Sequence, residues 1–324
     1  MSARPGAAWT VRPGRPQDTA SVLQLFEATF GKPTTPEAYA WKFYASPWPL
    51  AASPAFVAAA GERVVGHLGG SPLRLRLGGR ELPAVHICVG MVAEDVRTQG
   101  VMRAVHRAAN EAWAAGGAEV ALALPNHNWV RLRERLDYRQ VFRLGWLWRS
   151  LRLPGPRGGR GIDVSPVETP GAEFDVLWEE AGRRYDAAVV RDRAWVRYRY
   201  AEAPAAAYRI LLARARGAPR GYLVYRAERP MATIADVFAA PEDHAARSAL
   251  VRAACRELRR ERASSVRMFA VPGTRIHREL RRRGFLPRRG AYDVTVVPFA
   301  EDLPWHVLRD PERFFVMAGD FDVV

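Results

Sequence analysis

Apolar residues recur along the chain with two different spacings, and these spacings predict an alternating order of helices and strands. Helix-type spacing runs from Asp18, the expected N-cap, to Phe30, and it returns over Glu37–Ala45, residues 100–115 and Trp129–Leu136. Apolar stretches of strand length lie between these helices. The predicted strands are Ala55–Ala60, Arg63–Pro72, Leu73–Leu77, Leu82–Ala93, Glu119–Leu124 and Arg139–Leu151. This order predicts an α+β domain with a mixed, mostly antiparallel sheet, which Arg139–Leu151 closes.

The second half of the chain repeats the pattern of the first half. Residues 119–142 align with residues 265–289 when Pro125 is placed over Pro272, and helix 100–115 then lies over residues 247–261 without a gap. The repeating unit has the size of a domain, which excludes a solenoid of short repeats. We therefore expect an N-terminal domain over 1–153, a Gly/Pro-rich linker over 154–170, a C-terminal domain over 171–300, and a tail over 301–324 that packs on the domains.

Composition narrows the class of protein. The 324 residues are 48% hydrophobic and 26% charged, which is typical of a soluble globular protein. No apolar run is long enough to cross a bilayer, and the first residues lack the apolar core of a signal peptide. Two cysteines, Cys88 and Cys255, are too few for a disulfide framework or a four-ligand zinc site. We expect a cytoplasmic protein with no membrane partner and no metal.

The charge is strongly positive but unevenly composed. The net charge is +15, from 47 arginines and only two lysines, Lys32 and Lys42. A surface selected for nucleic acid uses both cations, because both neutralise phosphate. Near-exclusive arginine beside abundant alanine, glycine and proline is typical of GC-rich coding, so nucleic acid is the less favoured partner. The arginine-rich stretches Arg256–Arg262 and Arg278–Arg283 are expected to be solvated helix faces, with RNA or an acidic partner as the alternative.

One junction in the first half predicts an anion site. An apolar strand ends at Val92 and Ala93, an irregular turn follows, and Gly100 opens a long helix. The first-turn amides of a helix have no partner within it, and the helix dipole adds positive charge there. Arg97 stands beside these amides, and Gly100 allows a ligand to approach the backbone closely. The turn is therefore suited to a pyrophosphate.

The segment Arg97-Thr98-Gln99-Gly100-Val101-Met102 resembles the phosphate loop of the GNAT superfamily of acyl-coenzyme A-dependent N-acyltransferases, whose pattern is Q/R-x-x-G-x-G/A. Arg97 and Gly100 match, whereas Met102 replaces the final small residue. The order of elements is similar to the family's in both halves, which implies two tandem GNAT-like domains with acyl-coenzyme A, in particular acetyl-coenzyme A, as co-substrate. The resemblance also implies contacts to the donor from Asn126 and Arg133, and an oxyanion-binding backbone amide at Met91, Val92 or Ala93.

The implied chemistry is direct attack of an amine on a thioester, which needs a neutral amine, an oxyanion donor and a proton for the leaving thiolate. The candidate general bases are Glu94 and Asp95 at the strand end, and His86 and His127, which can titrate near neutrality. Helix-entry acids and a satisfied sheet histidine are the ordinary alternatives. Arg133 occupies the position of the family's usual tyrosine acid, so it would stabilise the thiolate electrostatically, or solvent would supply the proton.

The second copy departs from the family pattern at the loop. Its aligned residues are His244-Ala245-Ala246-Arg247-Ser248-Ala249, which lack glycine and carry an arginine at the position of Gly100. A long side chain at that position would occupy the place of the donor. We therefore expect only the N-terminal copy to bind acyl-coenzyme A.

These observations favour an N-acyltransferase, in particular an acetyltransferase, whose acceptor is a primary amine on a small molecule or a peptide. Two other functions stay open from the sequence. One is a tRNA-dependent aminoacyl transferase of GNAT-like fold, which the basic charge favours. The other is a non-enzymatic module that senses coenzyme A or binds RNA, because no general base stands out. The chain is expected to be a monomer or a homodimer.

Overall fold

A computed structural model of the chain describes every residue except 1–8, 126–128, 130–135, 157, 205 and 322–324. The chain forms two compact units, neither of which is one continuous stretch. The first unit comprises Met1–Arg74, Leu82–Arg139 and Thr295–Leu303, and the second comprises Leu75–Glu81, Gln140–Val294 and Pro304–Val324. A helix suited by length and hydropathy to crossing a membrane is absent from the part of the chain that the structure describes.

The first unit is built on a mixed sheet. In chain order its elements are β1 (Thr10–Pro13), α1 (Thr19–Phe30), α2 (Pro36–Tyr44), β2 (Ala55–Ala60), β3 (Arg63–Leu77), β4 (Arg80–Val92), the short 3-10 helix η2 (Glu94–Val96), α3 (Val101–Ala115) and β5 (Val120–Ala123). The strands are ordered β1-β2-β3-β4-β5, followed by the end of β13 (Leu286–Pro298). β4 and β5 pair in parallel, whereas the β1–β2, β2–β3 and β5–β13 pairs are antiparallel.

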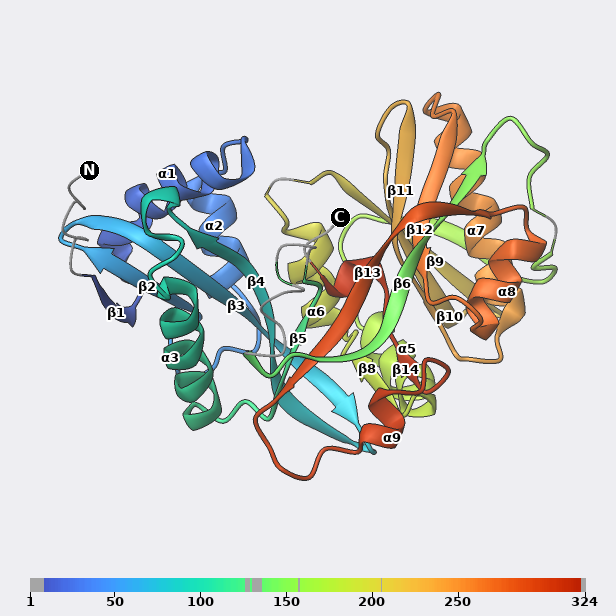
Figure 1. Ribbon diagram of the computed structural model, residues 1–324. Coiled ribbons are helices and arrows are strands. Elements are labelled where there is room, and N and C mark those ends of the chain that lie inside the picture. Colours follow the sequence, from blue (N-terminus) through green and yellow to red (C-terminus); the bar gives the residue numbers. More distant parts are fainter. Residues whose placement is uncertain (1–8, 126–128, 130–135, 157, 205, 322–324) are drawn as a thin grey trace. The chain divides into compact units, whose positions relative to one another are not determined.

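Small residues on β3 let helices pack closely against both faces of this sheet, with α1 and α2 on one side and α3 on the other (Figure 1). A Cβ at Gly66 would lie 2.5 Å from Cγ1 of Val101, the first residue of α3. A Cβ at Gly69, on the opposite face, would lie 2.2 Å from the Phe43 ring of α2. Because successive strand residues face opposite sides, Gly66 makes room for α3 and Gly69 makes room for α2. Gly66 thereby seats the first turn of α3 beside the end of β4.

Most predicted elements of the first half are confirmed within one or two residues at each end. Two details differ. Residues Arg63–Leu77 form one long strand rather than two, since Pro72 is accommodated within it. Asp18 precedes α1 but does not cap it with its side chain, because its carboxylate accepts hydrogen bonds from the Arg12 guanidinium at 2.6 and 2.7 Å and from the Arg15 amide at 2.7 Å. The predicted helix Trp129–Leu136 falls mostly outside the described residues.

The second unit also combines helices with mostly antiparallel strands. Its elements are β6 (Arg139–Ser150), β7 (Asp163–Val167), α5 (Glu173–Ala181), β8 (Ala187–Val189), α6 (Arg193–Val196), β9 (Tyr208–Ala215), β10 (Ala218–Arg226), β11 (Met231–Ala239), α7 (His244–Arg260), β12 (Ser265–Ala270), α8 (Arg275–Arg282), most of β13, α9 (Trp305–Leu308) and β14 (Phe314–Phe315). The strands are ordered β13-β6-β12-β11-β10-β9-β7, with β11 and β12 parallel. Both copies therefore show the predicted α+β class, each with a parallel pair at the centre of a mostly antiparallel sheet.

The strand expected to close the first sheet belongs instead to the second. β6 pairs with β12 in antiparallel register from Ser150–Ser265 to Gly145–Ala270, and the Trp146 ring stacks on Phe269 with centroids 3.6 Å apart. The first sheet is completed by the end of β13, where Thr295 lies opposite Ala123. Each compact unit thus takes a strand from the other copy. The prediction that Arg139–Leu151 closes the first sheet is wrong, because the repeat supplies an equivalent strand that occupies that edge.

The linker and the tail also contain regular structure. Within the stretch 154–170, residues Asp163–Val167 form β7, which pairs with β9 at the edge of the second sheet. In the tail, β14 pairs with β8 in parallel, and Phe314 to Ala318 are buried in the second unit. The apolar side chains of the tail therefore complete the hydrophobic core of the second unit.

The core of the second unit contains a fully buried ion cluster. Arg191 is 0% exposed, and its guanidinium lies 3.2 Å from a carboxylate oxygen of Asp236 on β11 and 2.7 Å from one of Asp320 in the tail. The Tyr200 and Tyr222 hydroxyls donate to the same Asp236 oxygen at 3.0 and 2.8 Å. Arg191 therefore ties the tail to the central strand.

Candidate functional site

The parallel strands β4 and β5 separate before β4 ends. Their pairing runs from Ala84–Val120 to Ile87–Ala123, where β5 ends, whereas β4 continues to Val92. Val89 lies in this continuation and has a φ of 53°, a left-handed conformation that is rare for a β-branched residue. The β4 backbone is thus irregular just after the two strands part. Among the described residues, β5 does not pair with the last residues of β4.

A buried histidine holds the irregular residue in place. The Nδ1 of His67 on β3 donates to the Val89 carbonyl oxygen at 2.8 Å, so its Nε2 accepts from the Tyr39 hydroxyl at 3.1 Å. His67 is fully buried, and this burial lowers its pKa to about 4. The imidazole is therefore neutral at pH 7 and acts as a hydrogen-bonding brace between α2 and the bulged part of β4.

The turn after β4 presents backbone amides at the start of α3. Within the turn, the Val96 and Gln99 amides donate to the Ala93 and Val96 carbonyls at 3.1 and 3.0 Å. Gly100 precedes the helix with a φ of 77° and supplies no side-chain cap. The amides of the first helical turn, from Val101 onward, have no partner within the helix. Uncapped amides, the helix dipole and an exposed Arg97 guanidinium are thus present at this turn, and its role as an anion site stays a prediction.

The three backbone amides proposed for the oxyanion do not face the same way. The Ala93 amide donates to the Val65 carbonyl of β3 at 2.8 Å, so it is already used. Strand geometry turns the amide of Met91, two residues earlier, toward the same side. The Val92 amide points to the opposite edge, where β5 has ended. The choice of oxyanion donor stays a prediction, and strand alternation directs only the Val92 amide of the three away from β3.

The two acids beside the turn have different surroundings. The Asp95 carboxylate receives two hydrogen bonds from the Arg63 guanidinium, at 2.7 and 2.8 Å, and these lower its pKa. The Glu94 side chain is 90% exposed and lies 4.0 Å from Arg97. Glu94 is thus the more available carboxylate for exchanging protons with a ligand.

A hollow of about 530 Å³ lies beside these groups. Its lining combines one face of α1, including Ser21, Gln24 and Thr29, with Val92, Glu94 and other residues of the turn. The α1 residues were not predicted to belong to a functional site. The signal was present in the polar face of α1, but nothing in the pattern indicated that this face meets the turn.

The remaining candidates lie elsewhere or are not described. His86 sits in the paired part of β4, opposite Leu122, and is 5% exposed. That position belongs to the interior of the sheet rather than to its open edge. Asn126, His127 and Arg133 lie outside the described residues.

An aromatic group missed by the sequence analysis adjoins the open part of β4. A Cβ at Gly90 would lie 2.2 Å from the Trp129 indole, whose ring centroid is 5.9 Å from that of Tyr138. The Tyr138 hydroxyl lies 3.0 Å from Nε2 of His106 on α3. Burial lowers the pKa of His106 to about 4, so this group is also neutral.

The corresponding junction of the second copy is built differently. α7 begins at His244, so the residues aligned with the phosphate loop are helical rather than part of a turn. The Asp243 carboxylate caps the helix by accepting from the Ala246 amide at 2.9 Å. Arg247 is buried and donates to the carbonyls of Ala240 and Pro241 at 2.6 and 2.8 Å. A carboxylate occupies the helix start, which opposes binding of a second anion there.

Comparison with known proteins agrees with this architecture. Residues 10–141 match the family model of the acetyltransferase (GNAT) domain. The fold is similar to a probable N-acyltransferase from Enterococcus faecalis V583, a conserved protein of unknown function, with a TM-score of 0.71 and 13% identity over 90% of this chain and 73% of that one. A search of curated proteins found no match.

Two further solved structures are GCN5-related N-acetyltransferases. The one from Kribbella flavida has a TM-score of 0.69 and 17% identity, and covers 89% of this chain and 70% of its own. The one from Anabaena variabilis ATCC 29413 has a TM-score of 0.71 and 13% identity, with 89% and 72% covered. Residues 10–141, which carry the β4–turn–α3 junction and the parting parallel strands, thus match the acetyltransferase (GNAT) domain, and the chain shares the fold of these N-acetyltransferase structures.

Proposed function

We propose that the chain transfers an acyl group, in particular acetyl, from acyl-coenzyme A to a primary amine, with the donor bound in the first unit. The observation that carries the proposal is the parting of β4 from β5 after Ile87, directly before an uncapped helix start flanked by Arg97. An extended thioester arm can add along the open strand edge while its pyrophosphate meets the helix amides.

The turn Arg97–Met102 supplies the donor contacts in this proposal. The Arg97 side chain is 58% exposed and can turn toward a phosphate, which would exchange its 4.0 Å contact with Glu94 for a charge-assisted hydrogen bond. Thr98 and Gln99 border the same turn, and Val101 and Met102 contribute amides of the first helical turn. Gly100 keeps this approach free of a side chain.

The transfer step places the acceptor nitrogen against the thioester carbonyl. The neutral amine forms a C–N bond, the C–S bond breaks, and the Val92 amide donates a hydrogen bond to the oxygen on which negative charge develops. One proton leaves the nitrogen and one proton reaches the thiolate. We assign the first of these transfers to Glu94, directly or through a water molecule, and leave the second to solvent.

The hollow beside the turn is the proposed acceptor site. It lies next to Val92 and Glu94 and has a volume of about 530 Å³, which suits a small amine or the end of a peptide side chain. The Glu94 carboxylate would attract the protonated amine before accepting its proton. The proposed acceptor is thus cationic in solution.

A turnover assay tests this function. Thiol release from acetyl-coenzyme A is followed with a panel of small primary amines and lysine-containing peptides. Glu94→Gln should lower kcat by about 10²-fold. Glu111→Gln, an exposed change on α3 away from the turn, should leave kcat unchanged. Equal activity of the two variants would contradict the role of Glu94, and no thiol release with any acceptor would contradict the transfer itself.

A further inference from the structure

A strongly basic hollow lies in the second unit. It is lined by His244, Arg275, Arg278, Glu279, Arg282 and Arg283, and its volume is about 690 Å³. Three of its arginines lie at positions i, i+3 and i+7 of α8, so they share one face of that helix. Arg278 pairs with Glu312 at 3.1 Å outside this lining, and within the hollow the four guanidinium groups meet one carboxylate, that of Glu279.

That carboxylate does not balance the four arginines, because it is already bound elsewhere. Glu279 is buried, and its two oxygens accept hydrogen bonds from Arg247 at 2.8 and 3.0 Å, with His244 as a further partner. Burial acts to raise the pKa of the Glu279 carboxyl, but the contacts with Arg247 and His244 outweigh it, so the pKa is lowered. With Arg247 included, five arginines stand against the two carboxylates Glu279 and Glu312, so the positive charge of the hollow is left in excess.

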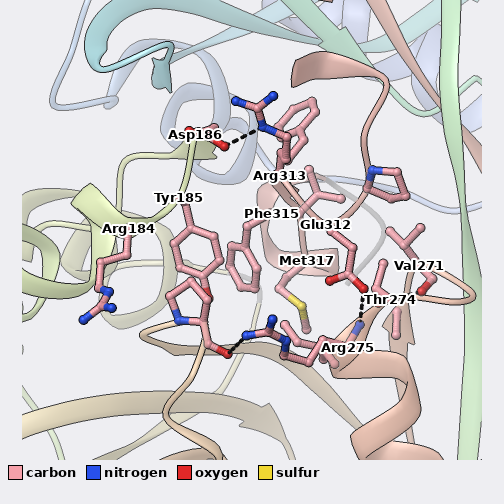
Figure 2. Close-up of a pocket in the computed structure, with 16 residues that line it drawn as sticks. Arg184, Tyr185, Asp186, Val271, Thr274, Arg275, Glu312, Arg313, Phe315 and Met317 are labelled. Carbon is pink, nitrogen blue, oxygen red and sulfur yellow. Dashed lines mark hydrogen bonds and ion pairs between the residues drawn. The ribbon is translucent and has the colours of Figure 1, made fainter. Parts of the chain in front are cut away.

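A second cavity of about 350 Å³, which has an apolar wall and a charged rim, shares Arg275 with the basic hollow. Figure 2 shows Tyr185, Phe315 and Met317 gathered in this cavity, with Val271 on its other side. The Arg275 guanidinium contacts the Pro241 carbonyl at a long 3.4 Å. Its contact is weak, so Arg275 can turn toward a ligand at the mouth of the cavity.

We propose that these two cavities together bind a small molecule that carries a phosphate or diphosphate and a flat apolar body. Arginine forks match phosphate oxygens in charge and geometry, and a ring packed against the Tyr185–Phe315 pair, whose centroids lie 4.7 Å apart, would exclude water from the second cavity. The concave shape and the second cavity favour a small molecule over a nucleic acid, which would use an extended basic surface. This site is independent of the transfer proposed for the first unit.

Calorimetry with inorganic pyrophosphate tests the basic hollow. Every protein in the series is the full chain with Arg97→Ala, so that the turn of the first unit does not contribute. Arg278→Gln with Arg282→Gln should weaken pyrophosphate binding at least tenfold. Arg281→Gln with Arg289→Gln removes the same charge from exposed residues that do not line the hollow, and it should change the affinity less than twofold. Equal weakening in both double variants, or no binding to the starting protein, would overturn the proposal.

Two further titrations test the chemical class of the ligand. Phenyl phosphate should bind at least fivefold more tightly than inorganic phosphate, because its ring can enter the second cavity. Equal affinities would overturn the assignment of that cavity. A short heterogeneous RNA that binds more tightly than pyrophosphate, with the same dependence on Arg278 and Arg282, would replace the small molecule by a nucleic acid and so overturn the proposed class.

Discussion

The Nδ1 of His67 lies 2.8 Å from the carbonyl oxygen of Val89, the β4 residue whose φ is 53°. This single contact joins the interior of β3 to the point where β4 leaves its parallel partner. Tyr39 supports the other side of the imidazole, so three elements meet at the irregular residue. The shape of the open strand edge therefore depends on a histidine that takes no part in the proposed chemistry.

The buried histidine makes stability depend on pH. The pKa of His67 is about 4 in the folded chain and near 6.5 when unfolded, so the unfolded chain binds the proton first as the pH falls. The free energy of unfolding should fall between pH 6.5 and pH 4, by up to about 3 kcal/mol from this residue. Below pH 4 its contribution stays constant. Denaturant titrations at several pH values measure this loss.

His67→Gln is the control for that loss. Its amide can still donate to Val89 and accept from Tyr39, but it does not titrate. The variant should show a shallower fall in unfolding free energy over the same range, with His106 accounting for part of the remainder. Parallel curves for the two proteins would mean that His67 is not held neutral by burial.

Close packing at Gly66 should link stability to donor binding. Gly66→Ala places a Cβ against Cγ1 of Val101, so the first turn of α3 must shift, at a cost of about 1–3 kcal/mol in unfolding free energy. The shift should also weaken acetyl-coenzyme A binding. Val101→Ala removes the clashing atom, so the double variant should recover part of both losses relative to additivity. Additive effects across the double-mutant cycle would contradict the proposed contact.

The buried ion cluster of the second unit should be costly to break. Arg191→Met leaves Asp236 and Asp320 buried without their cation and should lower the unfolding free energy by about 3–5 kcal/mol. Burial already raises the pKa of Asp320 although Arg191 opposes this, so the loss should be smaller at low pH, where Asp320 is protonated. Arg193→Met, which removes an exposed pair with Asp175, should cost less than about 1 kcal/mol. Similar losses in both variants would contradict the account.

Sequence pattern was sufficient for the local part of the site. The strand, the turn and the helix around Arg97 and Gly100 follow from apolar spacing and from glycine, which are local signals. The parting of β4 from β5 and the role of His67 depend on contacts between residues distant in sequence. In the sequence, the residues around His67 and around Val89 have the pattern of ordinary strands, so neither feature could be predicted.

The exchange of strands between the units could not be read from the sequence for a different reason. β6 and β13 are both long, aromatic-containing strands at equivalent positions of the repeat, so each could pair beside either β5 or β12. Only the three-dimensional register, with Ser150 opposite Ser265 and Thr295 opposite Ala123, distinguishes the two arrangements. Internal repetition itself makes this pairing ambiguous.

The most direct test of the central claim is calorimetric binding of acetyl-coenzyme A to the full chain at moderate salt. The proteins compared are the parent, Arg97→Ala with Gly100→Arg, and Arg107→Ala, an exposed change on α3 away from the turn. The account predicts one-to-one binding to the parent and to Arg107→Ala, and a loss of at least a hundredfold in the double variant. Unchanged binding in the double variant, or two sites per chain, would contradict a single donor site in the first unit.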